Sequence, residues 1–528
     1  MDKIPEPYWN RIMRQADSCL EGQGIAMFMK GKAVCRKYQS TSWNGRCKLT
    51  IKLLGRLLGI HRPLFISGYR EDIAIKQQIE DLEVYCECLE KKMIQSKDHA
   101  SLKKVDSFNN DREQVGRGSY NDDHNMRLDI IVRLLAVKLK EQDSFLILMA
   151  ENLDKGGLEE VVRTLAVEYH ARGLPVKVLC AHEGGHIARQ LISEGIEVII
   201  FHGKKAMFDQ YIKENRPIIV NTHFVESYID VLRKYNVPVI ETIHNMYVFL
   251  SHGRCRKENE KATKVKGYIA VSEIAKDFYI RKIISGDNPK ITVIGNAISE
   301  KYRITMERND VRDLLGISEE TMVFISVGSV DARKNQIGML RALDIVRKIT
   351  SVDNMLLLVG NSTDIEYEHK LQKMLQDREF GDSVKWIGFR NDVINILNAA
   401  DVFILDSYYE GWSMAATEAL CCGLPLIHSR CGSGVELTAE GHNGILIDNP
   451  LKDMEFLDNV EIYDRMHAGI NENIRQLVDA MLDMIANRQM WQARKYDIKE
   501  YCRRNFSISK MIEQYLDVYL EACEKDEI

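Results

Sequence analysis

Short apolar segments alternate with longer amphipathic stretches over most of this 528-residue chain, and this alternation constrains the fold more than any other feature. Continuous apolar strands separated by helical stretches are typical of a parallel sheet covered by helices on both faces. The alternation predicts two doubly wound α/β domains in tandem, with ligand sites at the carboxyl ends of their strands. The predicted strands form two runs, at 144–150, 176–180, 197–201, 217–221 and 238–243, then at 322–328, 355–360, 384–388, 402–406 and 425–429.

Length and charge narrow the class of protein further. A single core rarely grows beyond about 250–300 residues, so two domains plus an extra element is the natural expectation. The net charge of -5 lacks the basic footprint of a nucleic-acid-binding protein. No run of about 18 apolar residues occurs, and the first ten residues carry acids and prolines instead of a signal-peptide core. We therefore expect a cytoplasmic protein with no nucleic-acid partner.

The first 62 residues are basic, with twelve Lys and Arg against four acids. Within them, Leu49 to Ile60 (LTIKLLGRLLGI) sets apolar residues around Lys52 and Arg56. Such a stretch fits an anionic membrane surface, because the basic groups can stay among the head groups while the leucines enter the acyl boundary. It fits equally well a helix packed on the core of the protein itself.

The region after residue 62 differs from the first 62 residues in its pattern of apolar and polar residues. One apolar seam from Ile75 to Met93 predicts a helix, whereas the polar stretch from Ser96 to about Arg127 shows no period and predicts a linker. We expect an N-terminal extension, mainly helical, then two Rossmann-like domains, with a C-terminal helix packing back on the first; the boundaries are 1–140, 141–300, 301–504 and 505–525.

Cysteines and histidines give no convincing metal site. The twelve cysteines are scattered, and several lie in apolar segments, so free thiols are expected. Cys86 and Cys88 form a close pair without a second pair at metal-ligand spacing. The segment His182 to His186 (HEGGH) matches a zinc-protease pattern that requires a helix, but its two interior glycines disfavour one. No metal is therefore expected.

The stretch from Asp401 to Pro425 is the richest in chemical groups. Ser413 is placed to cap a helix running to about Cys422, whose first amides and dipole suit a diphosphate. Glu410 precedes the cap and Glu418 lies in the second turn. Eight residues span at most about 12 Å of helical rise, so the two carboxylates can bracket a sugar diphosphate from its two ends.

The segment EGWSMAATE, residues 410–418, resembles the E-x7-E motif of retaining glycosyltransferases of family 4. That family has the GT-B fold, in which two Rossmann-like domains face each other across a cleft. Further blocks of the family are matched in order: the glycine loop at Gly156-Gly157, the histidine of ETIHNMY, and the segments IAVSE, VIGNAI, VGSVDARKNQ and GSGVELTAEGHNGILI. The resemblance covers about residues 144–525, including a last helix, FSISKMIEQYLDVY, that in this fold crosses back to the first domain.

The resemblance implies roles for individual residues. Glu418 is expected to bind the nucleotide ribose, Glu410 the hydroxyls of the donor hexose, and Lys334 the diphosphate leaving group. His244 is expected beside the hexose, whereas His223 in the segment NTHF is expected to be a core residue or to line the cleft. Carboxylates accept from vicinal hydroxyls, and a fixed cation stabilises the charge that develops as the glycosyl-phosphate bond breaks.

Other residues complete the implied donor site. Gly156 and Gly157 let the backbone approach donor and acceptor closely. Most family members have an arginine where this chain has Ser329, and we expect Arg333 to supply the missing charge. The catalytic set implied is His244, Lys334 and Glu410, and the donor-binding set is Gly156, Gly157, Ser329, Arg333, Lys334, Gly388, Phe389, Arg390, Gly411, Trp412, Ser413, Met414 and Glu418, of which Gly388, Phe389 and Arg390 are expected to border the base.

The expected activity is metal-independent, retaining hexosyl transfer from a UDP- or GDP-linked sugar, without a cofactor. The expected acceptor is a glycan or a lipid-linked molecule in cell-surface polysaccharide synthesis, with residues 1–62 holding the protein to the inner face of the membrane. Two alternatives stay open. One is a non-catalytic nucleotide-sugar-binding scaffold, which Ser329 favours, and the other is a different GT-B enzyme, such as a sugar-nucleotide epimerase or a phosphorylase.

Overall fold

The computed structural model describes residues 119–524, except for 227, 285–289, 299–303 and 378–379. The predictions for residues 1–62, for the helix at 75–93 and for the Cys86–Cys88 pair lie outside the described residues. The predicted linker is wrong at its end, because helix α5 already begins at Ser119 and runs to Glu141. Its first turns are polar, and the apolar spacing that holds the helix in place begins only at Leu128.

The first domain is built on a seven-stranded parallel sheet with the order β3-β2-β1-β4-β5-β6-β7. The order reverses between β1 and β4, which is where ligands bind in doubly wound sheets. Its strands are β1 Leu146–Ala150, β2 Val176–Cys180, β3 Glu197–Ile200, β4 Ile219–His223, β5 Val239–Ile243, β6 Gly267–Ala270 and β7 Ile291–Val293. Its helices, besides α5, are α6 Gly157–Ala171, α7 His186–Ser193, α8 Lys205–Asn215, α9 Ile229–Lys234, α10 His252–Ala262 and α11 Glu273–Lys282.

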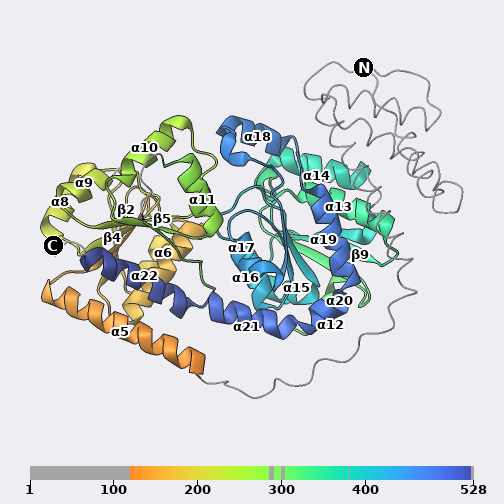
Figure 1. Cartoon of the computed structure of the whole chain (residues 1–528), viewed down its shortest axis with the longest axis horizontal. Coiled ribbons are helices and arrows are strands. Elements are labelled where there is room, and N and C mark those ends of the chain that lie inside the picture. The colour runs from red at the N-terminus through yellow and green to blue at the C-terminus, as the bar shows by residue number, and fades with distance from the viewer. Residues whose placement is uncertain (1–118, 227, 285–289, 299–303, 378–379, 525–528) are drawn as a thin grey trace, which may run out of the picture. The chain divides into compact units, whose positions relative to one another are not determined.

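The second domain has a six-stranded parallel sheet with the order β10-β9-β8-β11-β12-β13. Its strands are β8 Met322–Val327, β9 Asn354–Val359, β10 Val384–Trp386, β11 Val402–Leu405, β12 Leu426–Ser429 and β13 Gly444–Ile447. The α-helices from here to the end of the described chain are α12 Arg308–Leu315, α13 Gln336–Ile349, α14 Ile365–Asp377, α15 Val393–Ala399, α16 Met414–Cys421, α17 Gly434–Thr438, α18 Asn459–His467, α19 Ile474–Ala486, α20 Arg488–Ala493, α21 Lys495–Asn505 and α22 Ile508–Glu524. Short 3-10 turns lie at η2 Ala332–Lys334, η3 Gly381–Ser383, η4 Ala439–Gly441 and η5 Met454–Phe456. Figure 1 shows helices of this domain, among them α13 and α16, around the sheet.

These two sheets confirm the predicted fold class. Each of the predicted strands overlaps an observed strand, and three strands, β6, β7 and β13, were not predicted as strands. All three are at most four residues long. Length alone does not explain why they were missed, because β3, β10, β11 and β12 also have no more than four residues and were predicted.

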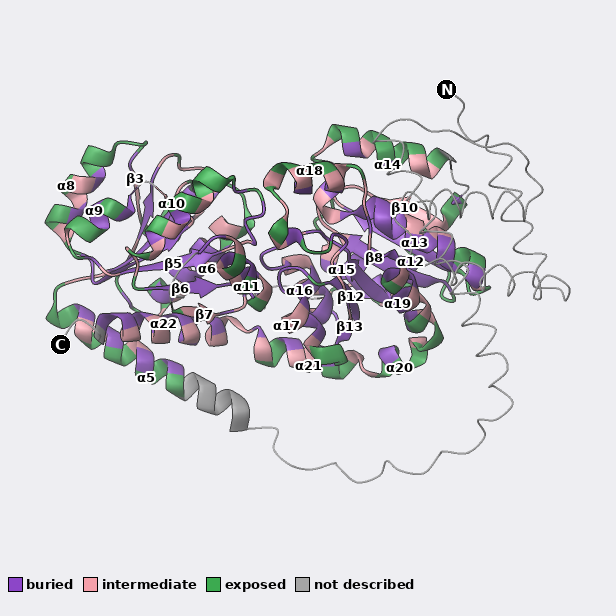
Figure 2. Cartoon of the chain, turned by 45° about the horizontal axis from the view of Figure 1, so that its top comes forward, coloured by how far each residue is buried: buried purple, intermediate pink, exposed green. Residues whose placement is uncertain are grey.

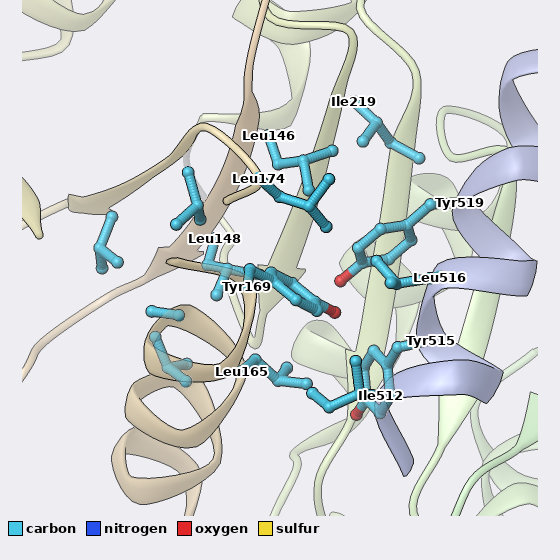
Figure 3. Close-up of a cluster of buried hydrophobic side chains, with 14 of the residues drawn as sticks. Leu146, Leu148, Leu165, Tyr169, Leu174, Ile219, Ile512, Tyr515, Leu516 and Tyr519 are labelled. Carbon is cyan, nitrogen blue, oxygen red and sulfur yellow. The ribbon is translucent and has the colours of Figure 1, made fainter. Parts of the chain in front are cut away.

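The last described helix, α22, completes the core of the first domain. Figure 3 shows Tyr515 and Tyr519 of α22 pointing into the same buried cluster as Tyr169 of α6 and Leu146 of β1. The Tyr519 hydroxyl donates to Asn221 Oδ1 in β4 at 2.7 Å. Helix α22 thus belongs to the layer that covers the first sheet, although Tyr519 lies almost 300 residues after Asn221 in the sequence.

Helix α5 lies alongside α22 and has two different faces (Figure 2). Its buried face joins the first domain's core, and Arg127 in its first half pairs with Glu513 and Asp517 of α22 at 3.1 and 2.6 Å. Ile130, Leu134 and Val137 stay exposed. Among the described helices, none is long and apolar enough to cross a membrane.

One buried carboxylate holds the base of the second sheet. Asp401, directly before β11, pairs with Arg308 and Arg312 at 2.8 Å each and with Arg488 at 3.2 Å. It also accepts from the backbone N–H of Val323 in β8 at 2.9 Å. Arg312 is only 1% exposed, so its buried positive charge requires the carboxylate of Asp401 as a partner.

Candidate functional site

The loop between β11 and α16 forms the first wall of the candidate site. Ser413 caps α16, since its Oγ accepts from the backbone N–H of Ala416 at 3.2 Å. The backbone N–H of Ser413 in turn donates to Ser433 Oγ at 3.0 Å. The predicted helix is therefore present, one residue shorter at its end than expected, and its first turn carries the free amides and positive dipole end that suit an anion.

Glu410 in this loop pairs with two cations from the second domain's first strand-to-helix connection. Its Oε1 lies 2.6 Å from Lys334 Nζ and 2.8 Å from Arg333 Nη1. Burial by itself raises the pKa of Glu410, but the two positive charges and hydrogen bonds outweigh burial and hold the pKa below its usual value. The carboxylate is thus ionised at neutral pH and lies between two positive charges.

The turn that carries these cations is fixed by its neighbours. Residues Ala332–Lys334 form the 3-10 turn η2, and the Asp331 side chain caps it by accepting from the backbone N–H of Lys334 at 3.1 Å. Asn335 follows in the left-handed region at φ 55° and caps α13. The turn therefore presents Arg333 and Lys334 as a pair from a rigid connection.

Asp406 ties this turn to the loop that carries Glu410. Its buried carboxylate accepts from the side-chain amides of Asn335, Asn473 and Asn471 at 2.8, 2.7 and 3.4 Å. Burial raises the pKa of Asp406 to about 7, in spite of these hydrogen bonds. Sequence reasoning did not single out this residue, although its place directly after a buried strand and before the Glu410 loop was a usable signal.

Ser329 and Arg333 lie together. The Ser329 hydroxyl donates to Asp331, and Arg333 Nη2 donates to Ser329 Oγ at 3.4 Å. The same guanidinium reaches Glu410 through its other nitrogen. Arg333 therefore places a positive charge next to the position where Ser329 stands in place of an arginine.

Glu418, the second carboxylate of the motif, has a different environment from Glu410. It lies in the second turn of α16, and burial raises its pKa to about 7. The two carboxylates therefore differ in charge near neutral pH. Glu410 is ionised, whereas Glu418 is close to the midpoint of its titration and gains its charge as the pH rises.

His244 directly follows β5, and His223 ends the neighbouring strand β4. His223 Nδ1 and His244 Nε2 lie 2.7 Å apart, with the rings stacked at 5.0 Å between centroids. Burial lowers the pKa of His244 to about 3, so the imidazole is neutral at pH 7. His223 is fully buried, as expected, but it also contacts His244 directly, which the spacing in the sequence did not reveal.

The two domains touch where these groups lie. A β-carbon on Gly411, next to Glu410, would come within 1.6 Å of the His244 carbonyl oxygen. Ser272 Oγ, after β6, donates to the Gly411 carbonyl at 3.1 Å. The structure thus brings His244 to the same junction as Glu410, Arg333 and Lys334.

The remaining predicted residues surround this cluster or lie apart from it. Trp412 Nε1 donates to Thr417 Oγ1 at 3.0 Å, and its ring packs on Gly295 of the first domain. Met414 is the first residue of α16. Gly156 and Gly157 lie at the start of α6, and Gly388, Phe389 and Arg390 lie in the loop after β10. Neither set takes part in the ion pairs of Glu410. Phe389 is exposed, and Arg390 pairs with Asp392 at 2.7 Å.

The HEGGH segment does not form one helical face. Helix α7 begins at His186, so His182 lies before it, and His182 Nε2 instead pairs with Glu151 at 2.8 Å. Within the described part of the chain, no group of three or more His, Cys, Asp or Glu side chains is arranged to hold a metal ion.

Two doubly wound parallel-sheet domains that meet at this junction, with a final helix that packs on the first domain, define the GT-B class of fold. A family model described as "Glycosyltransferase Family 4" matches residues 155–302, and one described as "Glycosyl transferases group 1" matches residues 307–463. The chain belongs to the group 1 glycosyltransferases, of the family 4 type.

Similar proteins agree with this assignment. The chain is 27% identical over 241 residues to the UDP-Gal:alpha-D-GlcNAc-diphosphoundecaprenol alpha-1,3-galactosyltransferase of Escherichia coli, covering 44% of this chain and 55% of that protein. It is 23% identical to the N-acetyl-alpha-D-glucosaminyl L-malate synthase of Bacillus anthracis, covering 45% of this chain and 56% of that enzyme. The chain therefore spans about half the length of these curated relatives.

Solved structures share the fold. The crystal structure of Anabaena HepE in complex with UDP superposes with a TM-score of 0.60 at 17% identity, covering 71% of this chain and all of that one. WaaG, described as a glycosyltransferase involved in lipopolysaccharide biosynthesis, superposes with a TM-score of 0.50 at 16% identity, covering 71% of this chain and 99% of that one. At these identities the likeness shows the fold.

Proposed function

We propose that this protein transfers a hexosyl group from a nucleotide-diphosphate sugar to a glycan or lipid-linked acceptor, with retention of the anomeric configuration and without a metal ion. The observation that carries the proposal is the cluster of Glu410, Lys334 and Arg333 beside the start of α16. Two cations and a helix N-terminus next to one ionised carboxylate suit a ligand with a diphosphate at one end and hydroxyls at the other.

The donor that we propose is a UDP-linked sugar. The HepE structures contain UDP and UDP-glucose, and the Escherichia coli relative is named for UDP-Gal. The diphosphate would draw Lys334 and Arg333 into charge-assisted hydrogen bonds, which frees Glu410 to accept from hexose hydroxyls. Glu418, further along α16, would accept from the ribose.

The reaction breaks the bond from the anomeric carbon to the phosphate oxygen and forms a bond from that carbon to the acceptor oxygen on the same face. The acceptor proton passes to the leaving diphosphate. Lys334, Arg333 and the amides of α16 stabilise the negative charge that grows on this leaving group, which is where preorganised charge contributes most to rate. Neutral His244 at the domain junction offers a hydrogen bond to the hexose without adding a competing charge.

The acceptor and the location of the protein are part of the same proposal. The Escherichia coli relative is named for a diphosphoundecaprenol acceptor, and residues 1–62 are basic. A lipid-linked acceptor on the inner face of the membrane, in surface polysaccharide synthesis, accounts for both. Co-sedimentation of the full chain with vesicles containing anionic lipid tests this, with a Lys52→Glu/Arg56→Glu variant as the comparison. Equal partitioning of the two proteins would remove residues 49–60 from the proposal.

Donor turnover is the direct test of the activity. UDP-glucose, UDP-galactose and GDP-mannose are compared by thermal shift, since a bound ligand stabilises the folded state, and by release of the nucleotide. We expect Lys334→Ala to lower kcat about 10²–10³-fold, while Lys348→Ala, at a solvent-exposed pair with Asp344, leaves kcat unchanged. NMR of the product then gives its anomeric configuration.

Each alternative predicts a different result. Tight donor binding without turnover for any acceptor would support a non-catalytic scaffold. Conversion of the donor sugar without an acceptor would support an epimerase. An inverted anomeric centre in the product would disprove retention while leaving transfer itself in place.

A further inference from the structure

Two cysteines that are 81 residues apart in the sequence meet where α16 packs on α21. Cys421 Sγ at the end of α16 lies 3.0 Å from Cys502 Sγ in α21. Both are free thiols; Cys421 is half-buried and Cys502 is buried. A sulfur–sulfur bond is about 2.05 Å long, so the two sulfurs need to approach by only about 1 Å to form one.

The backbones around the pair are packed tightly. A β-carbon on Gly423, two residues after Cys421, would come within 2.5 Å of the Lys495 carbonyl oxygen at the start of α21. Cys502 Sγ also lies 3.7 Å from the Thr417 carbonyl of α16. These contacts keep the two helices at a fixed separation, so the thiols face each other in the folded protein without any large movement.

Other described cysteines contact atoms outside the Cys421–Cys502 pair. Cys422 Sγ points to the Ile394 carbonyl at 3.7 Å, and Cys431 Sγ lies 3.4 Å from Ser429 Oγ. Cys180 Sγ, in the first domain, lies 3.2 Å from the Glu183 carbonyl. Cys422 is thus next to the pair in the sequence but faces away from it, which makes it a matched control.

We propose that Cys421 and Cys502 form a modification site at which a disulfide oxidant, such as oxidised glutathione, produces an intrachain cross-link. The more exposed Cys421, as its thiolate, attacks one glutathione sulfur and releases the first glutathione thiolate. Cys502, as its thiolate, then attacks Cys421 Sγ and releases the second. Two cysteine thiols and one oxidised glutathione give one protein disulfide and two reduced glutathiones, so electrons and protons balance.

The cross-link would join two functionally distinct segments. Helix α16 carries Glu418 and begins at the candidate anion site, whereas α21 leads directly into α22, which belongs to the first domain's core. Closing a loop of this length restricts the unfolded chain strongly, so the oxidised protein should unfold at a higher temperature. This inference does not depend on the proposed transfer reaction.

The experiment uses the full chain, reduced and then equilibrated with oxidised glutathione. Non-reducing tryptic digestion with mass spectrometry should yield the peptide of residues 391–430 linked to the peptide of residues 500–503. Because the first peptide contains both Cys421 and Cys422, variants assign the bond: Cys422→Ser should keep the linked pair, and Cys421→Ser should lose it. The wild-type and Cys422→Ser proteins should gain several degrees in Tm on oxidation, reversed by a dithiol reductant, whereas Cys421→Ser should gain none.

Three results would overturn the inference. The first is glutathione attached to Cys421 without a protein cross-link. The second is a linked peptide that persists in Cys421→Ser but disappears in Cys422→Ser. The third is an equal rise in Tm for Cys421→Ser and wild type, which would trace the stabilisation to other cysteines.

Discussion

The carbonyl oxygen of His244 lies so close to Gly411 that a β-carbon there would be 1.6 Å from it. One residue follows β5 of the first domain and the other follows β11 of the second. The two domains thus meet backbone to backbone, directly beside Glu410. Glycine is required at this place because any side chain would hold the two loops apart.

Gly411→Ala should therefore act on the reaction more than on the fold. The added methyl group cannot be accommodated unless His244 moves away from Glu410, and a displacement of about 1 Å in a reacting assembly can reduce rate about 100-fold. We expect kcat/KM for the donor to fall at least tenfold, measured as nucleotide release. Gly253→Ala in α10, where a β-carbon has open space, is the matched control. Wild-type kcat/KM in Gly411→Ala would show that this contact is not kept during turnover.

Moving the positive charge from position 333 to position 329 tests the role of Arg333. Arg333→Ala should weaken UDP-glucose binding and turnover, because a guanidinium that contacts both Ser329 and Glu410 is removed. Ser329→Arg in the same protein should restore a large part of both, since it returns a cation to the neighbouring position. Calorimetric titration with UDP-glucose measures binding independently of chemistry. If Ser329→Arg rescues neither binding nor turnover, Arg333 does not replace the missing charge.

The pH dependence of donor binding reports on Glu418. Burial raises the pKa of its carboxyl to about 7, and only the ionised form accepts from two hydroxyls at once. UDP-glucose affinity should therefore rise by up to about tenfold per pH unit below pH 7 and level off above it. UDP-glucose is the better probe because its diphosphate keeps its charge over this range.

The same carboxyl has the opposite effect on stability. Because its pKa is higher in the folded state, it stabilises the fold at low pH, and this contribution is lost as the pH rises from about 4.5 to about 7. Glu418→Gln should flatten both profiles. Asp406 also titrates near pH 7, so a profile that survives in Glu418→Gln would point to Asp406 instead.

Asp401→Ala should be the most destabilising change at the base of the second sheet. It leaves Arg308, Arg312 and Arg488 without their shared carboxylate, and breaking a buried ion pair costs about 3–5 kcal/mol. Denaturant unfolding gives the free energy directly. Glu461→Ala, which removes an exposed pair with Arg465, should change it little. Equal effects from the two variants would mean that the buried network does not stabilise the domain.

The sequence predicted the two sheets because most of their strands are visible as apolar runs. It did not reveal β6, β7 and β13, although other strands of three or four residues, such as β10, were predicted. The start of α5 was missed because its first turns are polar. Patterns along the chain therefore located most of the strands, long and short, and missed these three strands and the first turns of α5.

The candidate site shows the same limit. Glu410, Lys334 and the cap at Ser413 were visible as residue types at meaningful places, and the structure brings all three to one region. The contact between His223 and His244 joins neighbouring strands, so no spacing in the sequence predicts it. The amides around Asp406 come from two separate segments, one with Asn335 and the other with Asn471 and Asn473, and only folding brings them together.

Because Tyr515 and Tyr519 fill the core beside β1 and β4, the first domain stays incomplete while the ribosome is still making the second. The early strands are synthesised before α22, which supplies part of the cover of their apolar face. A chain truncated before α22 would accordingly lack part of the first domain's core, although the truncation follows the second domain in the sequence.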